Sequence, residues 1–533
     1  MGWSQERLEH VARTRLNGAK LIVVANREPY IHRYKNGKIE WKRPAGGLTT
    51  ALDPVMRACG GTWIGHGSGD ADRDVVDANG RIAVPPNDPS YTLRRIWLTK
   101  EQEEGYYNGF ANSSFWPMCH QVYCKPTFEP AHWQAYQDVN AIFAEAVLEE
   151  AQGGPALVFV QDYHFALLPK LLKQARPDLV VAQFWHIPWP NSETFHVCPW
   201  SKELIEGMLG NDLLSFHIQH HVNNFLETVD RTVECRIDRE HFAVERNEHK
   251  TLVRPHAISV DPNLAARYLG DDWEERAAAF RVEHNLGDRA LLLGVDRVDY
   301  TKGIPERLRA LDWLLEHHPE WHGTFHFLQV GAPSRTDIAT YRDLNEEVRM
   351  LAEKINITYG TPDWQPVIFL NEQYGPPEVT LLYRMATACV VSSLHDGMNL
   401  VAKEFVSARS DEQGMLILSR FTGAARELHD AIIVNPFAVQ EMAEAMVLAF
   451  TMPVEEQRRR MRKMRQRVEE HNIYRWAGRL LSEVGKMVEP MEESIDDSDS
   501  SDSGELALNE TDYEAMLAEC HALDALRMNM GGS

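Results

Sequence analysis

The sequence lacks the signals of a secreted or membrane protein. Its seven cysteines are scattered, odd in number and without a C-x-x-C pair, so neither a zinc site nor a disulfide framework is indicated. No apolar run approaches the length of a membrane span, and residues 1–20 lack the apolar core of a signal peptide. We therefore expect a cytoplasmic protein without a membrane partner.

Positive charge is also scarce. The formal net charge is −23, whereas a surface that neutralises nucleic-acid phosphates needs a basic excess. Nucleic acid is therefore not the expected partner, although an acidic protein can still hold an anionic metabolite in a local basic pocket. The G-x-G-x-x-G pattern of a nicotinamide oxidoreductase is missing too. The stretch Gly65–Asp70 has the wrong glycine spacing, and we interpret it as a loop near a ligand or a simple turn.

No pattern places a metal ion. On a helix His217 and His221 would share one face, with His220 beside them, but the sequence supplies no third ligand. The aspartate-rich segment near the C-terminus lacks the glycine and the final glutamate of a calcium-binding loop. We expect neither a metal nor another cofactor.

What the sequence does contain is enough apolar material for two cores, since 44% of its 533 residues are hydrophobic. Apolar, β-branched runs alternate with segments of helical period, which predicts an α/β protein with parallel sheets covered by helices on both faces. Residues 261–281 are polar and helical, and we place the boundary between two sheet-containing halves there. The predicted strands are Leu21–Ala25, Ala156–Val160, Leu179–Phe184, Ala290–Val295, Thr324–Val330, Val367–Leu370, Ala388–Val391, Met415–Leu418 and Ala431–Val434.

Polar side chains follow six of these strands. In open α/β sheets, ligands bind beyond the carboxyl ends of the strands. Six polar strand ends are hard to explain by contact with solvent alone, so we expect them to converge on one site. They are Asn26-Arg27, Asp162-Tyr163-His164, His186, Arg297 with Lys302, Arg335, and Asp396.

Two of these ends suit a sugar nucleotide. The strand ending before Asp396 leads into a helix-like segment whose first amides can hold phosphate, while Asp396 can accept bonds from sugar hydroxyls and Glu404 can reach a ribose. Arg297 and Lys302 suit a diphosphate that gains charge as it leaves. Taken singly, each segment could equally be a solvated turn or a surface ion-pair cluster.

An aromatic stretch has the residue types that bind a sugar or a phosphate. Tyr106-Tyr107-Asn108 and Phe115-Trp116-Pro117 bring rings and polar tips into what we interpret as one loop region. Aromatic faces stack on sugar rings, and a tyrosine hydroxyl can bond a phosphate. The alternative is a helical core element.

The C-terminal section differs from the rest. Residues 489–512 are dominated by Glu, Asp and Ser, which predicts disorder. Thr511 and Glu514 then have capping-box spacing, and apolar residues recur at helical spacing from Tyr513 to Leu523. We expect a short amphipathic helix after the acidic segment.

Taken together, residues 21 to about 487 resemble glycosyltransferase family 20, the trehalose-6-phosphate synthases. The resemblance rests on several motifs: Ala25-Asn26-Arg27, Ala45-Gly46-Gly47-Leu48, Tyr106-Tyr107-Asn108 with Trp116-Pro117, Asp162-Tyr163-His164, His186 through Pro190, Arg297 through Gly303, Pro333-Ser334-Arg335, and Asp396 through Glu404. It implies a GT-B fold, in which two Rossmann-like domains face each other across a cleft and the C-terminal helix crosses back to the first domain. We expect an acceptor domain at 1–262, a nucleotide-sugar donor domain at 263–472, the crossover helix at 473–488 and a tail at 489–533.

The resemblance also implies roles for individual residues. Catalysis would depend on Asp162, His186, Arg297, Lys302 and Asp396. The acceptor, through its phosphate and hydroxyls, would contact Arg27, Tyr107, Trp116, Asp162 and Arg335. The donor would contact Gly46, Gly47, His186, Arg297, Lys302, Asp396, Gly397, Met398, Asn399, Leu400, Val401 and Glu404.

The activity implied is a retaining transfer of glucose from a nucleotide-glucose, expected to be UDP-glucose, to glucose 6-phosphate, giving α,α-trehalose 6-phosphate without a metal. We expect a homo-oligomer whose other partners are these small molecules. The polar segment from Glu28 to Pro44, with a hairpin predicted at Asn36-Gly37, and the stretches Pro199-Trp200 and Phe216–Ile218 look more like the glucosylglycerol-phosphate synthases. Glycerol 3-phosphate is therefore an alternative acceptor, and a non-catalytic sugar-phosphate sensor is an alternative function.

Overall fold

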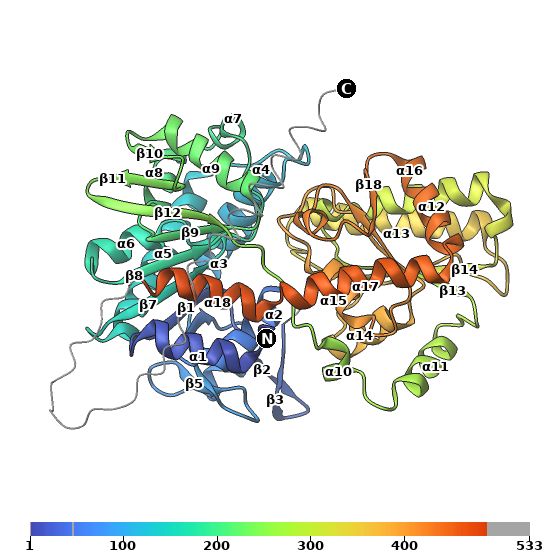
Figure 1. Ribbon diagram of the computed structural model, residues 1–533, viewed down its shortest axis with the longest axis horizontal. Helices are drawn as coiled ribbons and strands as arrows, with labels where there is room; N and C mark the ends of the chain where they lie inside the picture. Colours follow the sequence, from blue (N-terminus) through green and yellow to red (C-terminus); the bar gives the residue numbers. More distant parts are fainter. Residues whose placement is uncertain (1, 45–46, 488–533) are drawn as a thin grey trace. The chain divides into compact units, whose positions relative to one another are not determined.

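The computed structural model describes residues 2–44 and 47–487 (Figure 1). The predicted acidic segment and the helix after it lie outside the described residues, as does Gly46. Within the described part, no helix combines the length and the apolar character needed to cross a membrane.

The N-terminal lobe is built on a ten-stranded sheet in the order β10-β11-β12-β9-β8-β7-β1-β4-β6-β5. The strands from β12 to β6 in this order run parallel, while β5 at one edge and β11 and β10 at the other are joined by antiparallel pairing. The predicted strands at β1, β7 and β8 are confirmed. Their bounds are β1 Lys20–Arg27, β4 Thr62–His66, β5 Arg81–Val84, β6 Tyr91–Ile96, β7 Ala156–Gln161, β8 Val180–Phe184, β9 Leu213–Phe216, β10 Arg236–Asp238, β11 Ala243–Arg246 and β12 His249–Pro255.

The C-terminal lobe is built on a six-stranded parallel sheet in the order β15-β14-β13-β16-β17-β18. All six strands were predicted, because a parallel sheet buried on both faces gives nearly continuous apolar runs. Their bounds are β13 Ala290–Arg297, β14 Phe325–Ala332, β15 Val367–Leu370, β16 Ala388–Val391, β17 Met415–Ser419 and β18 Ile432–Val434.

Helices cover both faces of each sheet. Along β1, Leu21 and Val23 pack in the core that includes α1 and α2, whereas Ile22 and Val24 point to the opposite face, toward the core that includes α5. The helices of the N-terminal lobe are α1 Gln5–Leu16, α2 Gly47–Cys59, α3 Lys100–Glu103, α4 Trp116–His120, α5 Pro130–Ala151, α6 Leu168–Ala175, α7 Ser192–Phe195, α8 Ser201–Met208 and α9 Gln219–Thr232. Those that follow are α10 Leu264–Tyr268, α11 Trp273–Glu283, α12 Ile304–His317, α13 Ala339–Tyr359, α14 Pro376–Met385, α15 Leu400–Ala408, α16 Val439–Thr451, α17 Val454–Glu470 and α18 Ile473–Val484.

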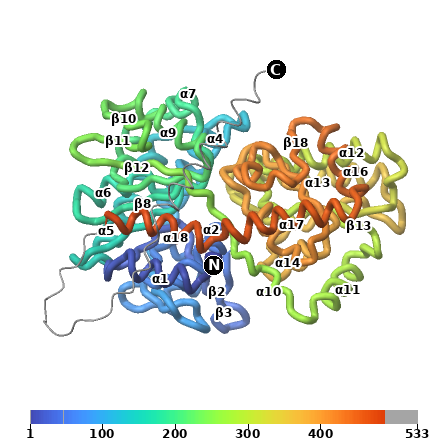
Figure 2. The backbone as a smooth tube through the Cα atoms, viewed as in Figure 1, coloured from blue at the N-terminus to red at the C-terminus, as the bar shows by residue number. Residues whose placement is uncertain are grey.

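The last described helix returns to the first lobe. α17 packs on α15 of the C-terminal lobe, and α18 packs on α1 and α2 of the N-terminal lobe (Figures 1 and 2). Asn472 caps α18 by accepting from the amide of Arg475, and its side-chain amide donates to the carbonyl of Trp3 at 2.9 Å. Trp476 then contacts the ring of Phe184 at 5.0 Å between centroids. The crossover helix implied by the family resemblance is thus present, while the domain limits at residues 262 and 472 stay predictions.

The predicted hairpin is also present. β2 Ile31–Lys35 and β3 Lys38–Lys42 pair antiparallel across a two-residue turn. Asn36 and Gly37 occupy it with φ of 52° and 74°, the left-handed conformation that such a turn needs and that these two residue types tolerate.

Candidate functional site

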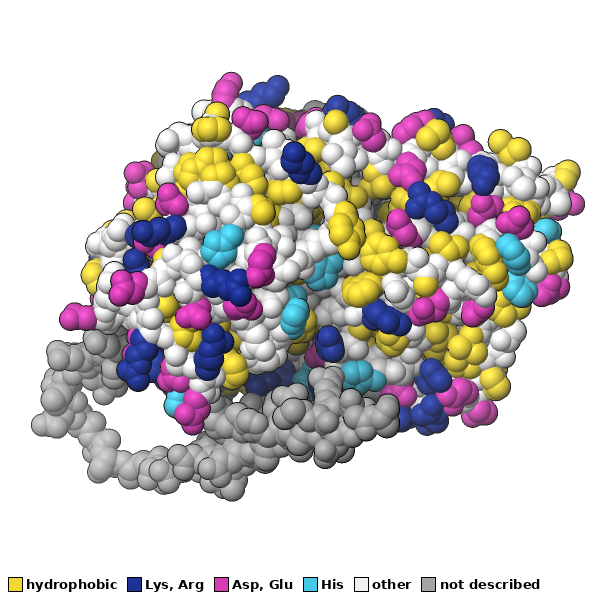
Figure 3. Space-filling view, turned by 90° about the horizontal axis from the view of Figure 1, so that it is seen from above, with side chains coloured by type: hydrophobic (Ala, Val, Ile, Leu, Met, Phe, Trp, Pro, Cys, Tyr) yellow, Lys and Arg dark blue, Asp and Glu magenta, His cyan; other side chains and the backbone are white. Residues whose placement is uncertain are grey.

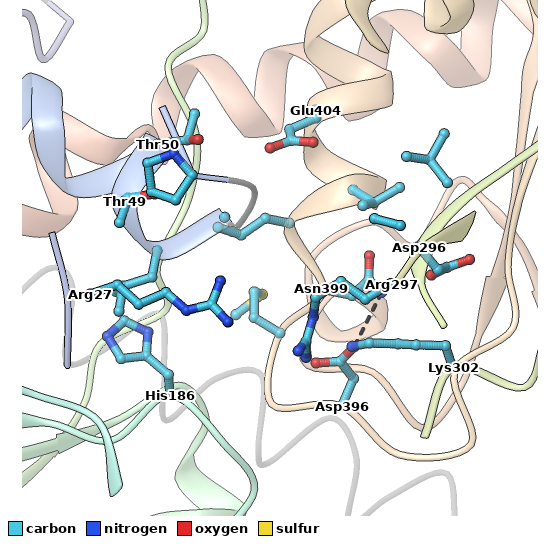
Figure 4. Close-up of a pocket in the computed structure, with 18 of the residues that line it drawn as sticks. Arg27, Thr49, Thr50, His186, Asp296, Arg297, Lys302, Asp396, Asn399 and Glu404 are labelled. Carbon is cyan, nitrogen blue, oxygen red and sulfur yellow. Dashed lines mark hydrogen bonds and ion pairs between the residues drawn. The ribbon is translucent and has the colours of Figure 1, made fainter. Parts of the chain in front are cut away.

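The carboxyl ends of strands from both sheets meet at one cavity of about 400 Å³. All six polar strand ends that the sequence singled out contribute to its lining, three from each lobe. Figure 4 shows Arg27 and His186 on the N-terminal side, the Lys302–Asp396 ion pair on the other, and Glu404 apart from that pair. The convergence expected from strand-end chemistry is therefore observed.

Most residues named from the sequence lie in this lining, whatever their roles. Gly397 is not among them: a Cβ there would lie 2.3 Å from the carbonyl oxygen of His186, so glycine allows the two lobes to approach closely. Gly46 lies outside the described residues. Those in the lining are Arg27, Gly47, Tyr107, Trp116, Asp162, His186, Arg297, Lys302, Arg335, Asp396, Met398, Asn399, Leu400, Val401 and Glu404.

Two helices begin at the cavity. α2 starts at Gly47 and α15 at Leu400, and a Cβ on Gly47 would lie 3.0 Å from Leu400 Cδ1, so the two N-termini abut. Asn399 caps α15 by accepting from the amide of Ala402 at 3.2 Å. The positive ends of two adjacent helix dipoles make this part of the cavity favourable for an anion.

An ion pair stands in front of α15. Lys302 Nζ lies 2.6 Å from Asp396 Oδ2, and Asn399 donates to the same oxygen at 3.1 Å. Burial alone would raise the pKa of Asp396, but the Lys302 ammonium outweighs it and lowers the pKa to about 2. Asp396 is therefore ionised at any ordinary pH.

Glu404 lies one turn into α15, and a tyrosine hydroxyl fixes its side chain. The hydroxyl of Tyr383 donates to its Oε2 at 3.0 Å, and burial raises the pKa of this carboxyl. One carboxylate oxygen stays available for a hydroxyl donor inside the cavity.

Aromatic rings and arginines line the neighbouring part. Arg27 donates to the Tyr107 hydroxyl at 3.0 Å, and Arg335 of the C-terminal lobe lies 4.1 Å above the ring of Trp116. Burial opposes ionisation of Tyr107, but Arg27 and Arg335 lower its pKa to about 7. Arginines that favour a phenolate in this way are suited to holding a dianion such as a phosphate.

Asp162 and His186 are neighbours at the ends of β7 and β8. The amide of His186 donates to Asp162 Oδ1 at 3.1 Å, and burial raises the pKa of Asp162 to about 7. Burial also lowers the pKa of His186 to about 3, so its ring is neutral, and its Nε2–H donates to Gln161 Oε1 at 3.0 Å. That leaves Nδ1 as an acceptor.

Three lining residues carry backbone strain. Asp162 has φ 69° and ψ −178°, a region that is almost restricted to glycine, while Arg335 and Asn399 have φ of 50° and 75°. Each such conformation costs roughly 1–3 kcal/mol and persists only where the surroundings enforce it, which is common at functional sites.

The aromatic stretch is not a loop, so that interpretation was wrong. Residues Glu104–Phe115 form a π-helix that continues into α4, because the segment packs against α5 along its length. Tyr106 is buried and donates to Asn26 Oδ1 at 3.0 Å, while Tyr107 and Trp116 reach the cavity. The segment is therefore a helical core element that also contributes side chains to the cavity.

Two further sequence interpretations change. His217 and His221 do not share a helix face, since His217 follows β9 and only His221 belongs to α9. Instead His217 lines the cavity and its Nε2–H donates to the carbonyl of His186 at 2.9 Å. In the stretch Gly65–Asp70, the first two residues end strand β4, and the amide of Ser68 in the turn beyond donates to the buried Glu28.

The sequence reasoning missed several lining residues, and most had a detectable signal. Thr49 and Thr50 follow Gly47 in the first turn of α2, and His120 follows Trp116 by one helical turn. Gln373 and Tyr374 had none, because they come from a loop after β15 with no distinctive pattern.

Within residues 2–44 and 47–487, no three His, Cys, Asp or Glu side chains are grouped so that they could hold an ion.

Comparison with known proteins places these observations among relatives. The model of the family described as Glycosyltransferase family 20 matches residues 19–486. A trehalose-6-phosphate synthase of Mycolicibacterium vanbaalenii is 38% identical over 488 residues, which cover 90% of this chain and 98% of that one. The UDP-forming α,α-trehalose-phosphate synthase of Pichia angusta is 34% identical, over 88% of this chain and 99% of its own.

Two solved structures are similar over most of the chain. The UDP-forming α,α-trehalose-phosphate synthase of Burkholderia xenovorans, in complex with glucose 6-phosphate, has a TM-score of 0.78 and 29% identity over 87% of this chain and 100% of its own. An E. coli protein bound with UDP-2-fluoro glucose has a TM-score of 0.78 and 28% identity over 88% and 99%.

Proposed function

Because this chain belongs to glycosyltransferase family 20 and has its GT-B fold, we propose that it transfers glucose from UDP-glucose to glucose 6-phosphate with retention, giving α,α-trehalose 6-phosphate. One observation carries the proposal: a single cavity brings Arg297 and Lys302 from one sheet end beside Arg27 and Arg335. Two anionic groups can therefore be held next to each other. The relatives named for this reaction include one solved with glucose 6-phosphate and one with a UDP-sugar analogue.

The donor half of the proposal uses the C-terminal lobe. The start of α15 and the cations Arg297 and Lys302 hold the diphosphate, and Glu404 accepts from ribose hydroxyls. Asp396, kept ionised by Lys302 at 2.6 Å, accepts from hydroxyls of the glucose. The neutral ring of His186 faces the same sugar from the N-terminal lobe.

The acceptor half uses both lobes. Arg27 and Arg335 bond the phosphate of glucose 6-phosphate, with Tyr107 and Trp116 around it, and Asp162 accepts from acceptor hydroxyls. Since Arg335 belongs to the C-terminal lobe, acceptor binding joins the lobes.

Catalysis then depends on position and charge. The acceptor hydroxyl attacks the anomeric carbon on the face from which the diphosphate leaves, and a leaving phosphate oxygen takes the hydroxyl proton. Arg297 and Lys302 stabilise the charge that develops on that phosphate, a role that can supply much of a rate enhancement. No carboxylate is required as a covalent nucleophile, and we propose that these two cations replace a metal ion.

Three coarser expectations complete the proposal. The six described cysteines are all free, which supports a reducing cytoplasm. On the face drawn in Figure 3, basic and acidic side chains lie interspersed, which gives no support to nucleic-acid binding. Ile433 on the edge strand β18 is partly exposed, and so are Phe421 and Phe437, whose rings contact each other. These exposed apolar side chains support a homo-oligomer, and light scattering tests it.

The test is a substrate panel. The protein is incubated with UDP-, GDP- or ADP-glucose and with glucose 6-phosphate or glycerol 3-phosphate, and products are identified by mass and NMR. We expect a 1,1-linked α,α-disaccharide phosphate from UDP-glucose and glucose 6-phosphate. A glucosylglycerol phosphate as the main product would contradict the acceptor, and binding of both substrates without transfer would indicate a sensor.

A further inference from the structure

One buried carboxylate touches both halves of the proposed site. Asp299 follows β13 and its side chain is fully buried. Its Oδ2 lies 3.4 Å from Arg297 Nη2 and 3.4 Å from Arg335 Nη1, so the two arginines share one oxygen. The other oxygen is also occupied.

Oδ1 of Asp299 organises the surrounding backbone. It accepts from the amide and from the hydroxyl of Thr301, each at 3.0 Å, and so caps the short helix Tyr300–Lys302. It also accepts from the indole Nε1–H of Trp116 at 3.4 Å, across the two lobes. The same carboxylate therefore fixes the turn that presents Lys302 and reaches the ring on which both arginines lie.

The two arginines need such a partner. Their guanidinium carbons lie 5.4 Å (Arg297) and 4.1 Å (Arg335) from the centre of the same Trp116 ring. Arg335 is only 4% exposed, so water screens their mutual repulsion poorly. Burial opposes ionisation of Asp299, yet the arginines lower its pKa, so the negative charge is present to hold them.

A second buried carboxylate, Glu150, has cation partners that lie away from the cavity. Glu150 is as deeply buried and pairs with Lys20, Arg81 and Arg94, but these cations contribute nothing to the lining of the cavity. Both cations of Asp299 line it. The contrast separates a carboxylate that supports the fold from one that sets the geometry of the site.

We infer that Asp299 is a positioning residue that ties the donor-side Arg297 to the acceptor-side Arg335 and sets the distance between the two bound phosphate groups. The inference rests on the proposed function and deepens it. Asp299 itself touches neither substrate. It fixes where the acceptor phosphate is held relative to the leaving diphosphate, and a misplacement of about 1 Å can cost on the order of 10²-fold in rate.

The expected signature is a split between rate and binding. In Asp299→Asn the amide keeps the shape and can still accept from Thr301, but the charge is lost. We expect kcat to fall about 10²-fold. The KM for glucose 6-phosphate should stay unchanged or fall, because uncompensated arginines attract anions more strongly. For the same reason inorganic phosphate, as a competitive inhibitor, should bind as tightly or more tightly.

Two further variants make the test decisive. Asp299→Ala removes both shape and charge, and we expect it to resemble Asp299→Asn in kcat. The matched control Glu150→Gln removes a buried carboxylate with three cations away from the cavity, so it should lower the melting temperature while kcat and both KM values stay within about threefold of wild type.

The inference is overturned if folded Asp299→Asn keeps kcat within threefold of wild type, or if Asn restores most of the rate that Ala loses. It is also overturned if KM for glucose 6-phosphate rises in parallel with the loss of kcat. Failure of the wild-type protein to transfer glucose would instead overturn the proposed function, so the two failures are distinguishable.

Discussion

Two carboxylates face the same cavity, each just after a strand, but they differ in lobe, in contact partner and in pKa. Asp396 follows β16 in the C-terminal lobe and lies 2.6 Å from Lys302 Nζ, and its pKa is about 2. Asp162 follows β7 in the N-terminal lobe and accepts from the backbone amide of His186, and burial raises its pKa to about 7. A cation in direct contact decides the outcome, since burial opposes ionisation in both.

This difference in pKa predicts that the two halves of the site respond differently to pH. A carboxylate with a pKa near 2 stays ionised at any working pH and so always accepts hydrogen bonds from hydroxyls. One with a pKa near 7 changes its charge around neutrality. We therefore expect the acceptor half, and not the donor half, to make activity depend on pH.

Removing the cation should have the largest effect. Lys302→Ala deprives the leaving diphosphate of one positioned charge and leaves Asp396 without its partner, so turnover should fall by on the order of 10²–10³. The pKa of Asp396 should rise toward that of Asp162, which would erase the contrast between the two carboxylates. Steady-state kinetics and thermal unfolding of the same preparation measure this. Near-normal turnover in the folded variant would place the leaving group elsewhere.

A smaller effect is expected from the acceptor phosphate. Arg335→Ala removes a charge-assisted partner worth roughly 1.5–3 kcal/mol, or about 10–150-fold in affinity for glucose 6-phosphate. Binding of free UDP, measured by calorimetry, should change little. Equal losses for both ligands would contradict the division of the cavity into two halves.

The pH dependence isolates Asp162. Its pKa in the folded protein is raised, so the carboxylate forms only as pH rises through about 7. Acceptor kcat/KM should therefore fall as pH drops below 7, approaching tenfold per pH unit. Glucose 6-phosphate itself titrates at about 6, as phosphomonoesters do. The profile of Asp162→Asn serves as the control and should keep the limbs of the substrate phosphate and of Tyr107, whose pKa is also about 7. An unchanged profile would assign the Asp162 limb to another group.

The smallest effect is expected from chelation. Arg297 and Lys302 neutralise the leaving group in our proposal, so turnover should persist in excess EDTA. The experiment compares wild type with and without chelator, and then with added magnesium or manganese. A strict requirement that either ion restores would mean that the two cations are not sufficient.

The sequence predicted the second sheet better than the first, for a physical reason. All strands of the C-terminal sheet are apolar runs, whereas β6 contains Arg94 and Arg95, which are buried by pairing with Glu150 and Glu28. A charged residue inside a strand hides the apolar pattern unless its partner is known, and the partners here are distant in sequence. β4 was missed because it is short and contains glycine.

Some residues of the site could likewise be predicted from the sequence, and others could not. Strand-end residues such as Asp162 and Arg335 could be found because parallel strands bring their carboxyl ends to one edge. The sequence does not single out Asp299, since nothing in it shows that Trp116 and Arg335 close over the carboxylate. The pKa contrast between Asp162 and Asp396 likewise depends on a tertiary contact that spacing does not encode.

The return of α18 to the first lobe has a consequence for synthesis of the protein. Residues 473–484 complete the core formed by α1, α2 and the face of β1 that includes Leu21, yet the ribosome makes them only after the whole second lobe. At 5–20 residues per second, synthesis of residues 264–470 takes on the order of ten to forty seconds. During that interval the apolar surface awaiting Trp476 stays uncovered, so the nascent first lobe is a natural client for chaperones that bind exposed apolar segments.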